Sequence, residues 1–185
     1  MNNDKAIFIH DVCTALFLIP YSTLCVAEVF FNYTVYPLFL THALFVHMFY
    51  DTVWLCVQPN AVSSFRKYIL FHHVMCMSLL LHPMMVPYDS DLTALSGLVE
   101  IDTSVATLRR LFRRTEFFNK LYITTNVLFR FVHETYMLFF IWFYFKDDSS
   151  LVRLHIMSGQ YFLTFFSYGI CLLSMYRGTR FLKDE

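Results

Sequence analysis

Charged residues are scarce in this chain of 185 residues, and neither sign dominates. Asp, Glu, Lys and Arg make up 15% of the residues, well below the fraction of about 25% that is usual in soluble proteins. The 14 basic residues balance the 14 acidic ones, so the formal net charge is zero. This balance excludes an intrinsically disordered chain, because disorder requires low hydrophobicity together with a high net charge.

Cysteine, glycine and proline are also rare. The five cysteines form an odd set without a CxxC pair, which argues against a disulfide-stapled scaffold. Four glycines and five prolines exclude collagen-like and low-complexity chains, and no internal repeat is visible. A glycine-rich phosphate loop and a nucleophile elbow are both missing.

Apolar residues, by contrast, make up 57% of the chain, and aromatic residues alone make up 19%. One domain of this length cannot cover so much apolar surface with polar side chains. A soluble helical protein would need polar stripes at a spacing of about 3.6 residues, and residues 9–31, 35–57 and 151–176 have none. The composition therefore predicts an all-α integral membrane protein that forms a single domain over residues 1–185.

Long stretches without charge mark the expected membrane spans. A helix that crosses the hydrocarbon core needs about 20 mostly apolar residues, and short polar breaks separate the apolar stretches here. The fourth stretch is interrupted by Glu100 and Asp102. The sequence predicts six transmembrane helices over residues 9–31, 35–57, 66–86, 92–112, 120–145 and 151–176.

The distribution of basic residues predicts the orientation of these spans, because cytoplasmic loops carry an excess of Lys and Arg. With six spans, Lys146 and Arg153 face one side, and Arg130 lies within a span. Eleven basic residues face the other side: Lys5, Arg66, Lys67, Arg109, Arg110, Arg113, Arg114, Lys120, Arg177, Arg180 and Lys183. This asymmetry predicts that both termini are cytoplasmic.

Five ionisable residues within the spans are candidates for function. Such side chains are costly in a bilayer, so they face a bundle interior or a wet cavity and mark function by default. At a helical rise of about 1.5 Å per residue, four different spans carry them at similar depths of about 9–15 Å from the cytoplasmic edge. They are Asp51, His72, His73, Glu100 and Arg130.

Helical spacing adds neighbours to this group, since residues three or four positions apart share a helix face. His47 shares a face with Asp51, and Thr103 shares one with Glu100. The adjacent rings of His72 and His73 point about 100° apart. They cannot both rest idle against one packed face, which favours a functional role for the pair.

Arg130, His133 and Glu134 form a polar stripe in the aromatic fifth span. A structural role is the alternative for such residues, because buried ion pairs fix helix register. In that interpretation Arg130 pairs with Glu134 or Glu100, and Asp51 pairs with a histidine.

Four short motifs, taken in order, resemble the TLC domain, which is shared by ceramide synthases, TRAM translocon proteins, the type 8 neuronal ceroid lipofuscinosis protein and the TLC-domain-containing proteins. The resemblance covers residues 35–176 and implies a six-helix bundle around a central cavity. The motifs are Tyr50-Asp51, His72-His73, Glu100-Ile101-Asp102-Thr103 followed by Leu108-Arg109, and Asn126 to Arg130.

In ceramide synthases the histidine pair belongs to the acyl-transfer centre, and a later HDxxD motif supplies acidic partners. This chain reads Val99-Glu100-Ile101-Asp102-Thr103 at that place, which disfavours ceramide synthesis. The resemblance is closer to TLC-domain proteins in which E-[IV]-x-T replaces HDxxD. That branch is associated with membrane-lipid composition and, in some members, with lipid acylation or transport. The resemblance also implies the endoplasmic reticulum or another endomembrane rather than the plasma membrane.

The resulting hypothesis is a protein of membrane-lipid homeostasis that binds an acyl lipid in its bundle and carries an acyltransferase-like site. His72 or His73 is the expected general base or transient acyl acceptor. Asp51 or Glu100 is expected to orient the imidazole. The expected lipid-binding residues are Arg130, His133, Thr103 and His47.

Membrane lipids are the expected partners, with acyl-CoA as a candidate donor and no resident cofactor or metal. A basic cluster at the cytoplasmic edge suits the phosphates of such a donor or, alternatively, anionic headgroups that fix topology. It suits a membrane better than nucleic acid, which is not an expected partner. A homo-oligomer is compatible with the sequence. The cluster consists of Arg109, Arg110, Arg113 and Arg114.

Two other classes stay open, and the residues do not decide whether the chain is an enzyme. The first is a non-enzymatic lipid-binding, lipid-sensing or cargo-escorting protein. The second is a di-iron oxidase or desaturase, which needs several histidine boxes, whereas this chain has one HH and a spacing of five between His42 and His47. Zinc held by His72, His73 and Cys76 is disfavoured, because an intramembrane cysteine is more often a small apolar filler.

Overall fold

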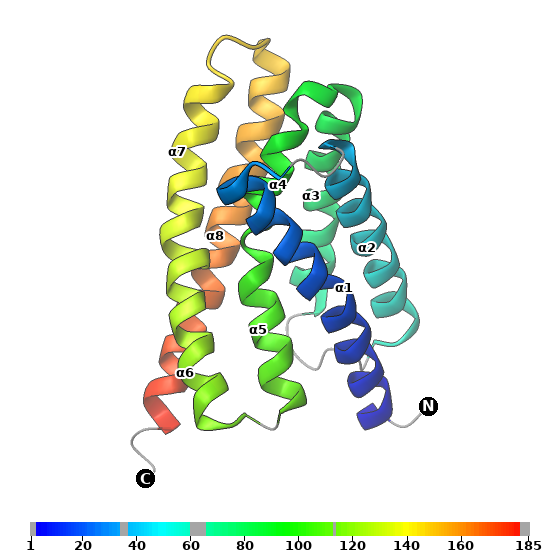
Figure 1. Cartoon of the computed structure of the whole chain (residues 1–185), viewed down its shortest axis with the longest axis vertical. Coiled ribbons are helices and arrows are strands. Elements are labelled where there is room, and N and C mark those ends of the chain that lie inside the picture. Colours follow the sequence, from blue (N-terminus) through cyan, green and yellow to red (C-terminus); the bar gives the residue numbers. More distant parts are fainter. Residues whose placement is uncertain (1–2, 34–36, 60–65, 113, 182–185) are drawn as a thin grey trace.

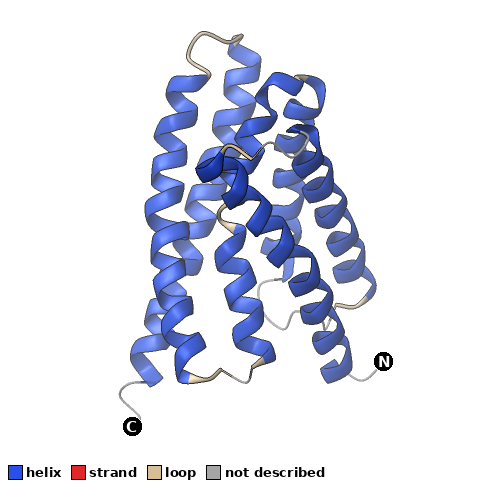
Figure 2. Ribbon diagram, in the orientation of Figure 1, coloured by secondary structure: helices blue, strands red, loops and turns tan. Residues whose placement is uncertain are grey.

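The computed structural model describes residues 3–33, 37–59, 66–112 and 114–181. Every element in these residues is helical (Figure 2), which confirms the expected all-α fold. The elements are α1 (Asn3–Phe31), α2 (Pro37–Val57), α3 (Arg66–Met85), the 3-10 helix η1 (Pro87–Ser90), α4 (Asp91–Gly97), α5 (Glu100–Leu111), α6 (Glu116–Thr125), the π-helix η2 (Asn126–His133), α7 (Glu134–Tyr144) and α8 (Ser150–Phe181).

The helices lie side by side along the long axis of the molecule (Figure 1). α1 packs against α5, α2 against α3, and α7 against α8, while α8 also contacts η2 and α3. α1 begins and α8 ends at the same end of the bundle, where α5 ends and α6 begins (Figure 1). We call this end the α5–α6 end, and the opposite end, with the loop between α7 and α8, the α7–α8 end.

Four helices in the described residues are long and apolar enough to cross a membrane: Asp4–Phe31, Leu38–Val57, Arg66–Met85 and Ser150–Tyr176. They correspond to the first, second, third and sixth expected spans. Large apolar side chains lie exposed on their surfaces, among them Leu16, Phe165 and Leu172, which are 73%, 67% and 68% exposed. An exposed apolar surface of this extent indicates contact with a membrane or another partner, so length and surface together indicate a membrane-associated protein.

The fourth and fifth expected spans are not single long helices. Residues 92–112 are divided between α4 and α5, and residues 120–145 between α6, η2 and α7. The interrupting residues are polar, and the bundle buries them: Glu100 and Asp102 are 6% and 0% exposed, and Asn126 and Arg130 are 1% and 8% exposed. Both series of short helices still run along the bundle (Figure 1).

A tightened turn joins α4 to α5. The amide of Leu98 donates to the carbonyl of Leu95 at 3.3 Å, and the amide of Ile101 donates to the carbonyl of Leu98 at 3.1 Å. These i→i+3 bonds are typical of 3-10 backbone, which often marks a functional or strained point within a helix. The turn sets Glu100 and Asp102 in the first turn of α5.

The π-helix η2 separates α6 from α7 over eight residues. Its i→i+5 bonding differs from that of an α-helix, and π segments frequently occur at functional sites. The wider turns change which residues share a face. Asn126 and Arg130 both reach the same carboxylate of α5.

Two glycines mark close helix–helix contacts. A Cβ atom at Gly97 would lie 2.7 Å from Sγ of Cys25 and 2.8 Å from the hydroxyl oxygen of Tyr21, both on α1. A Cβ atom at Gly159 on α8 would lie 2.6 Å from Cδ2 of Leu79 on α3. Small residues of this kind let membrane helices approach closely.

Replacement of Gly97 by Leu is expected to destabilise the bundle, because a side chain at this position would push α4 away from α1. Overpacking of this kind costs about 1–3 kcal/mol. Gly169→Leu is the matched control, because no other helix atom lies within 4 Å of a Cβ placed there. Thermal unfolding of the detergent-solubilised protein is the measurement, and equal midpoints for both variants would contradict the close contact of α1 and α4.

Candidate functional site

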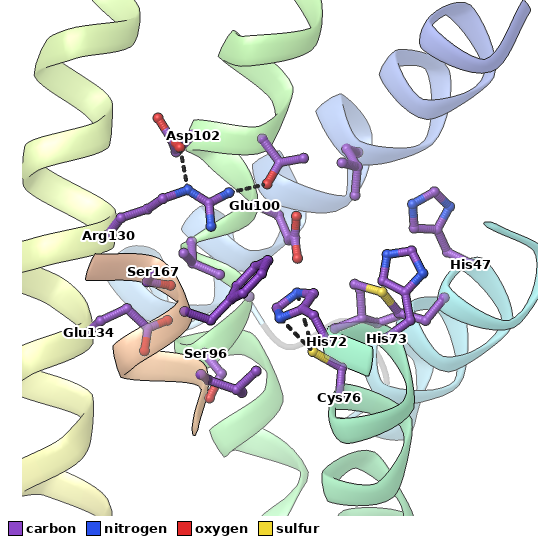
Figure 3. A pocket seen from close by; sticks show the side chains of 18 of the residues that line it. His47, His72, His73, Cys76, Ser96, Glu100, Asp102, Arg130, Glu134 and Ser167 are labelled. Carbon is purple, nitrogen blue, oxygen red and sulfur yellow. Dashed lines mark hydrogen bonds and ion pairs between the residues drawn. The ribbon is translucent and has the colours of Figure 1, made fainter. Parts of the chain in front are cut away.

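A cavity of about 550 Å³ lies within the bundle, and residues from α1 to α8 line it. This volume falls in the range of about 300–1,000 Å³ that is usual for small-molecule sites. Its wall combines apolar side chains, such as Leu18, Leu79 and Ile141, with several ionisable ones. Figure 3 shows how the polar side chains from different helices point into this space.

Asp51 on α2 joins two histidines from different helices. Its Oδ1 atom lies 2.7 Å from Nε2 of His10 on α1, and its Oδ2 atom lies 3.5 Å from Nε2 of His73 on α3. The hydroxyl oxygen of Thr52 lies 3.2 Å from Nδ1 of His73. We call His10, Asp51 and His73 the Asp51 cluster. The expected pairing of Asp51 with a histidine is therefore present, and the carboxylate fixes the orientation of the ring.

The Asp51 cluster continues toward the α5–α6 end through Asp11 and Arg110. Oδ1 of Asp11 lies 3.6 Å from Nδ1 of His10. Arg110 donates to the two carboxylate oxygens of Asp11, at 2.7 Å from Nη2 and 3.0 Å from Nε, in the bidentate geometry of a strong charge-assisted contact. The Arg110 side chain is 43% exposed, whereas that of Asp11 is 5% exposed. The network thus links the cavity to the surface of the bundle.

Part of the basic cluster expected near this end lines the cavity. Arg109, Arg110 and Arg114 line the cavity, and Arg113 lies outside the described residues. Arg109 donates to the side-chain oxygen of Asn119 at 2.6 Å. Three cationic side chains therefore contribute to the cavity wall.

A buried ion pair joins α5 to η2. Nε of Arg130 donates to Oδ2 of Asp102 at 2.6 Å, and the side chains are 10% and 1% exposed. Asp102 also accepts hydrogen bonds from Thr125 at 2.9 Å and from Asn126 at 3.0 Å. Nη2 of Arg130 donates to the hydroxyl of Thr103 at 2.9 Å. Both charges are thus extensively hydrogen-bonded, as a buried pair requires.

Arg130 forms its ion pair with Asp102 rather than with Glu134 or Glu100, the partners that the structural interpretation of the sequence named. Glu134 instead accepts from the side-chain amide of Gln160 on α8 at 3.0 Å. Both side chains line the cavity, but each finds its partner on another helix, Arg130 on α5 and Glu134 on α8. The side chain of Glu100 points into the cavity between Arg130 and the histidines (Figure 3).

The two adjacent histidines have different surroundings. Their ring centroids lie 5.9 Å apart with an interplanar angle of 55°, and both rings line the cavity. His73 belongs to the Asp51 cluster. His72 stacks on the ring of Phe166 from α8, with centroids 4.5 Å apart. Sγ of Cys76, one turn further along α3, lies 3.5 Å from Nε2 of His72.

Seven of the eight expected site residues line the cavity: Asp51, His72, His73, Glu100, Arg130, Thr103 and His47. The ring of His47 stacks on Phe17, with centroids 4.2 Å apart. His133 is not part of the wall, and its ring packs near those of Phe129 and Tyr136 instead. Its place in the π-helix turns it away from the face that Arg130 occupies.

Sequence reasoning missed His10 and Asp11, although both line the cavity. A signal was present, because this His-Asp pair directly precedes the charge-free stretch of residues 12–27. The sequence does not show that α1 lies close enough to α2 for His10 to reach Asp51.

A second polar group at the α7–α8 end was missed as well. Nε2 of His82 on α3 lies 2.8 Å from Oδ2 of Asp89, and the hydroxyl of Tyr144 donates to Oδ1 of the same carboxylate at 2.8 Å. His82 and Asp89 also line the cavity. Residues 87–91 read as a polar break in sequence, but the 3-10 turn of η1 folds Asp89 back onto α3.

The part of the chain that the structure describes contains no group of three or more His, Cys, Asp or Glu side chains that could hold a metal ion. Comparison with protein-family models, with curated proteins and with solved structures gives no match. The resemblance to the TLC domain therefore stays a prediction that rests on the short motifs given above.

Replacement of Asp102 by Ala is expected to destabilise the protein by about 3–5 kcal/mol, because it leaves the Arg130 guanidinium buried without its carboxylate. Thermal unfolding in detergent measures the effect. Asp147→Ala is the control, since the Asp147 side chain is 88% exposed in the loop before α8. The double variant Asp102→Leu/Arg130→Met is expected to recover most of the loss. A single variant as stable as wild type would show that the pair does not hold α5 to η2.

Proposed function

We propose that this chain is a multi-pass membrane protein of the TLC type that binds an acyl lipid within its helix bundle and acts in membrane-lipid homeostasis. The observation that carries the proposal is the cavity, which combines apolar walls with imidazole–carboxylate contacts inside a bundle of membrane-length helices. An acyl chain matches the apolar part of the wall. A polar or reacting group matches the histidines and carboxylates that point into the same space.

Six membrane segments with both chain termini in the cytoplasm are part of this proposal. The two series of short helices supply the fourth and fifth segments beside the four long helices. Buried polar groups within them are tolerated because they pair inside the bundle rather than facing lipid. Lys5 lies near the start of α1, Arg109 and Arg110 lie in the last turn of α5, and Arg114 and Lys120 flank the start of α6. These parts of the helices lie at the α5–α6 end (Figure 1), which favours the cytoplasm for that end. An endomembrane such as the endoplasmic reticulum is the proposed location.

Acyl transfer is the chemistry that we propose for the cavity. His73 is the general base for an acceptor hydroxyl or amine, and Asp51 orients its ring from 3.5 Å. The donor is a thioester such as acyl-CoA. Its phosphates bind beside the arginine side chains that line the cavity, because guanidinium groups suit phosphates. Glu100 lies on the other side of the histidine pair and faces the same space (Figure 3).

A non-enzymatic lipid-binding or cargo-escorting role is the second candidate, and one observation favours it. Both ring nitrogens of His73 already have partners, at 3.2 Å to Thr52 and 3.5 Å to Asp51. A histidine held through both ring nitrogens can fix helix positions without doing chemistry. In this role the purified protein would contain bound lipid but would not convert it.

Reaction of one introduced cysteine at a time with a membrane-impermeant maleimide tests the orientation of the chain in the membrane. In a background with Cys13→Ser and Cys56→Ser, Glu116→Cys is expected to react in sealed microsomes and Asp147→Cys only after permeabilisation. The two sites are matched, because the native side chains are 82% and 88% exposed. Equal labelling of both sites in sealed microsomes would contradict a topology of six spans with both chain termini in the cytoplasm.

Comparative lipidomics tests the function in cells that lack the native protein. Return of the wild-type protein to these cells is expected to change their acyl-lipid composition. The variant His72→Ala/His73→Ala is expected to leave the composition as it is in cells without the protein. His42→Ala/His155→Ala is the matched control, because both rings are exposed and neither lines the cavity. Equal expression of all forms must be verified. An unchanged lipidome for the cavity variant would exclude catalysis by the pair, and co-purified lipid in that variant would then support the binding role.

A further inference from the structure

The thiol of Cys76 and the imidazole of His72 form a close pair in the cavity wall. Sγ lies 3.5 Å from Nε2 and 3.9 Å from Nδ1, and the two residues are one helical turn apart on α3. Both line the cavity. A thiol within hydrogen-bond reach of an imidazole is the arrangement by which proteins activate a cysteine nucleophile.

Cys76 differs from the other four cysteines, all of which have free thiols. Cys25 is 0% exposed against Tyr21, and Cys171 is 3% exposed on α8. Cys13 and Cys56 are exposed on the outside of the bundle. Of the five, Cys76 alone lines the cavity, so it is the thiol that an occupant of the cavity would meet.

The two histidines of the pair also differ in the groups that hold them. His73 is engaged by Asp51 and Thr52. His72 is instead held by ring stacking on Phe166, with the rings inclined at 18°, and its hydrogen-bond partner in the described chain is the Cys76 thiol. Stacking fixes the ring, and the sulfur lies within 4 Å of both of its nitrogens.

We propose that Cys76 is the acyl-accepting nucleophile of the cavity, that His72 is its general base, and that the substrate is a fatty acyl thioester. This inference rests on the proposed acyl-lipid function and names its substrate class. The Cys76 sulfur bonds to the carbonyl carbon of the donor while His72 takes the thiol proton. The donor's own carbon–sulfur bond breaks, and His72 returns the proton to the departing thiolate. The products are an S-acyl cysteine and a free thiol.

A second step returns the cysteine to its original state. A hydroxyl or amine of the acceptor lipid attacks the S-acyl carbonyl and forms an ester or amide bond. The carbon–sulfur bond to Cys76 breaks, and the proton of the acceptor passes through His72 or His73 to the Cys76 thiolate. Neither step requires an oxidant, a reductant or a metal ion.

Incubation of the full-length protein in lipid nanodiscs with palmitoyl-CoA tests the proposal by intact mass and by peptide mapping. One palmitoyl group is expected on Cys76, and neutral hydroxylamine is expected to remove it, because a thioester is cleaved under these conditions. The background carries Cys13→Ser and Cys56→Ser, so that exposed thiols do not react. Cys171→Ser is the matched control and should acylate like the background, whereas Cys76→Ser should lose the hydroxylamine-sensitive group.

His72→Gln separates the base from a merely structural ring. Loss of a positioned general base is expected to slow acylation of Cys76 by about 10²-fold while the fold and lipid content stay unchanged. Acyl lipid bound in the protein without a palmitoyl group on Cys76 would overturn this inference and leave lipid binding intact. Absence of any acyl lipid from the purified protein would instead overturn the proposed function. Acylation at an unchanged rate in His72→Gln would refute the role of His72.

Discussion

The ion pair between Asp102 and Arg130 is the constraint on which the rest of the bundle depends. Each charge would be very costly if it were buried alone, so α5 and η2 must pack where the two side chains meet at 2.6 Å. The hydrogen bonds from Thr125 and Asn126 complete the coordination of the carboxylate. With α5 fixed in this way, α1 packs along it, and Asp11 reaches Arg110. The polar network therefore organises the helices that an apolar surface alone would leave free to slide.

The same constraint shapes the cavity. The turn that joins α4 to α5 and the π-helix between α6 and α7 carry polar side chains that line it, among them Glu100 and Arg130. Two acid–imidazole groups line opposite parts of that space, with Asp51 toward the α5–α6 end and Asp89 toward the α7–α8 end. Glu100 and the His72–Cys76 pair lie between Arg130 and the Asp51 cluster (Figure 3). A wall that combines apolar side chains with a few polar ones is the feature on which the proposed acyl-lipid function rests.

Composition was sufficient to predict an all-α protein, and charge-free stretches predicted the four long helices, because both features follow from the cost of charge in a bilayer. They also directed attention to Asp51, His72, His73 and Glu100, which line one cavity. The partner of Arg130 could not be predicted, since Asp102 lies on another helix and the pairing depends on how α5 packs against η2. His10, Asp89 and Tyr144 were missed because their contacts depend on how helices cross. Cys76 read as filler until the structure placed its sulfur beside an imidazole.

Cryo-electron microscopy of the protein in native-lipid nanodiscs tests the central claim most directly, because it shows what occupies the cavity. The account predicts a single tube of acyl-chain density between α3, α7 and α8, with one end at His72 and Glu100. It also predicts the contacts of Asp51 with His10 and His73 in the same map. A cavity filled by ordered water alone, or closed by side chains with lipid only on the outer surface, would contradict it.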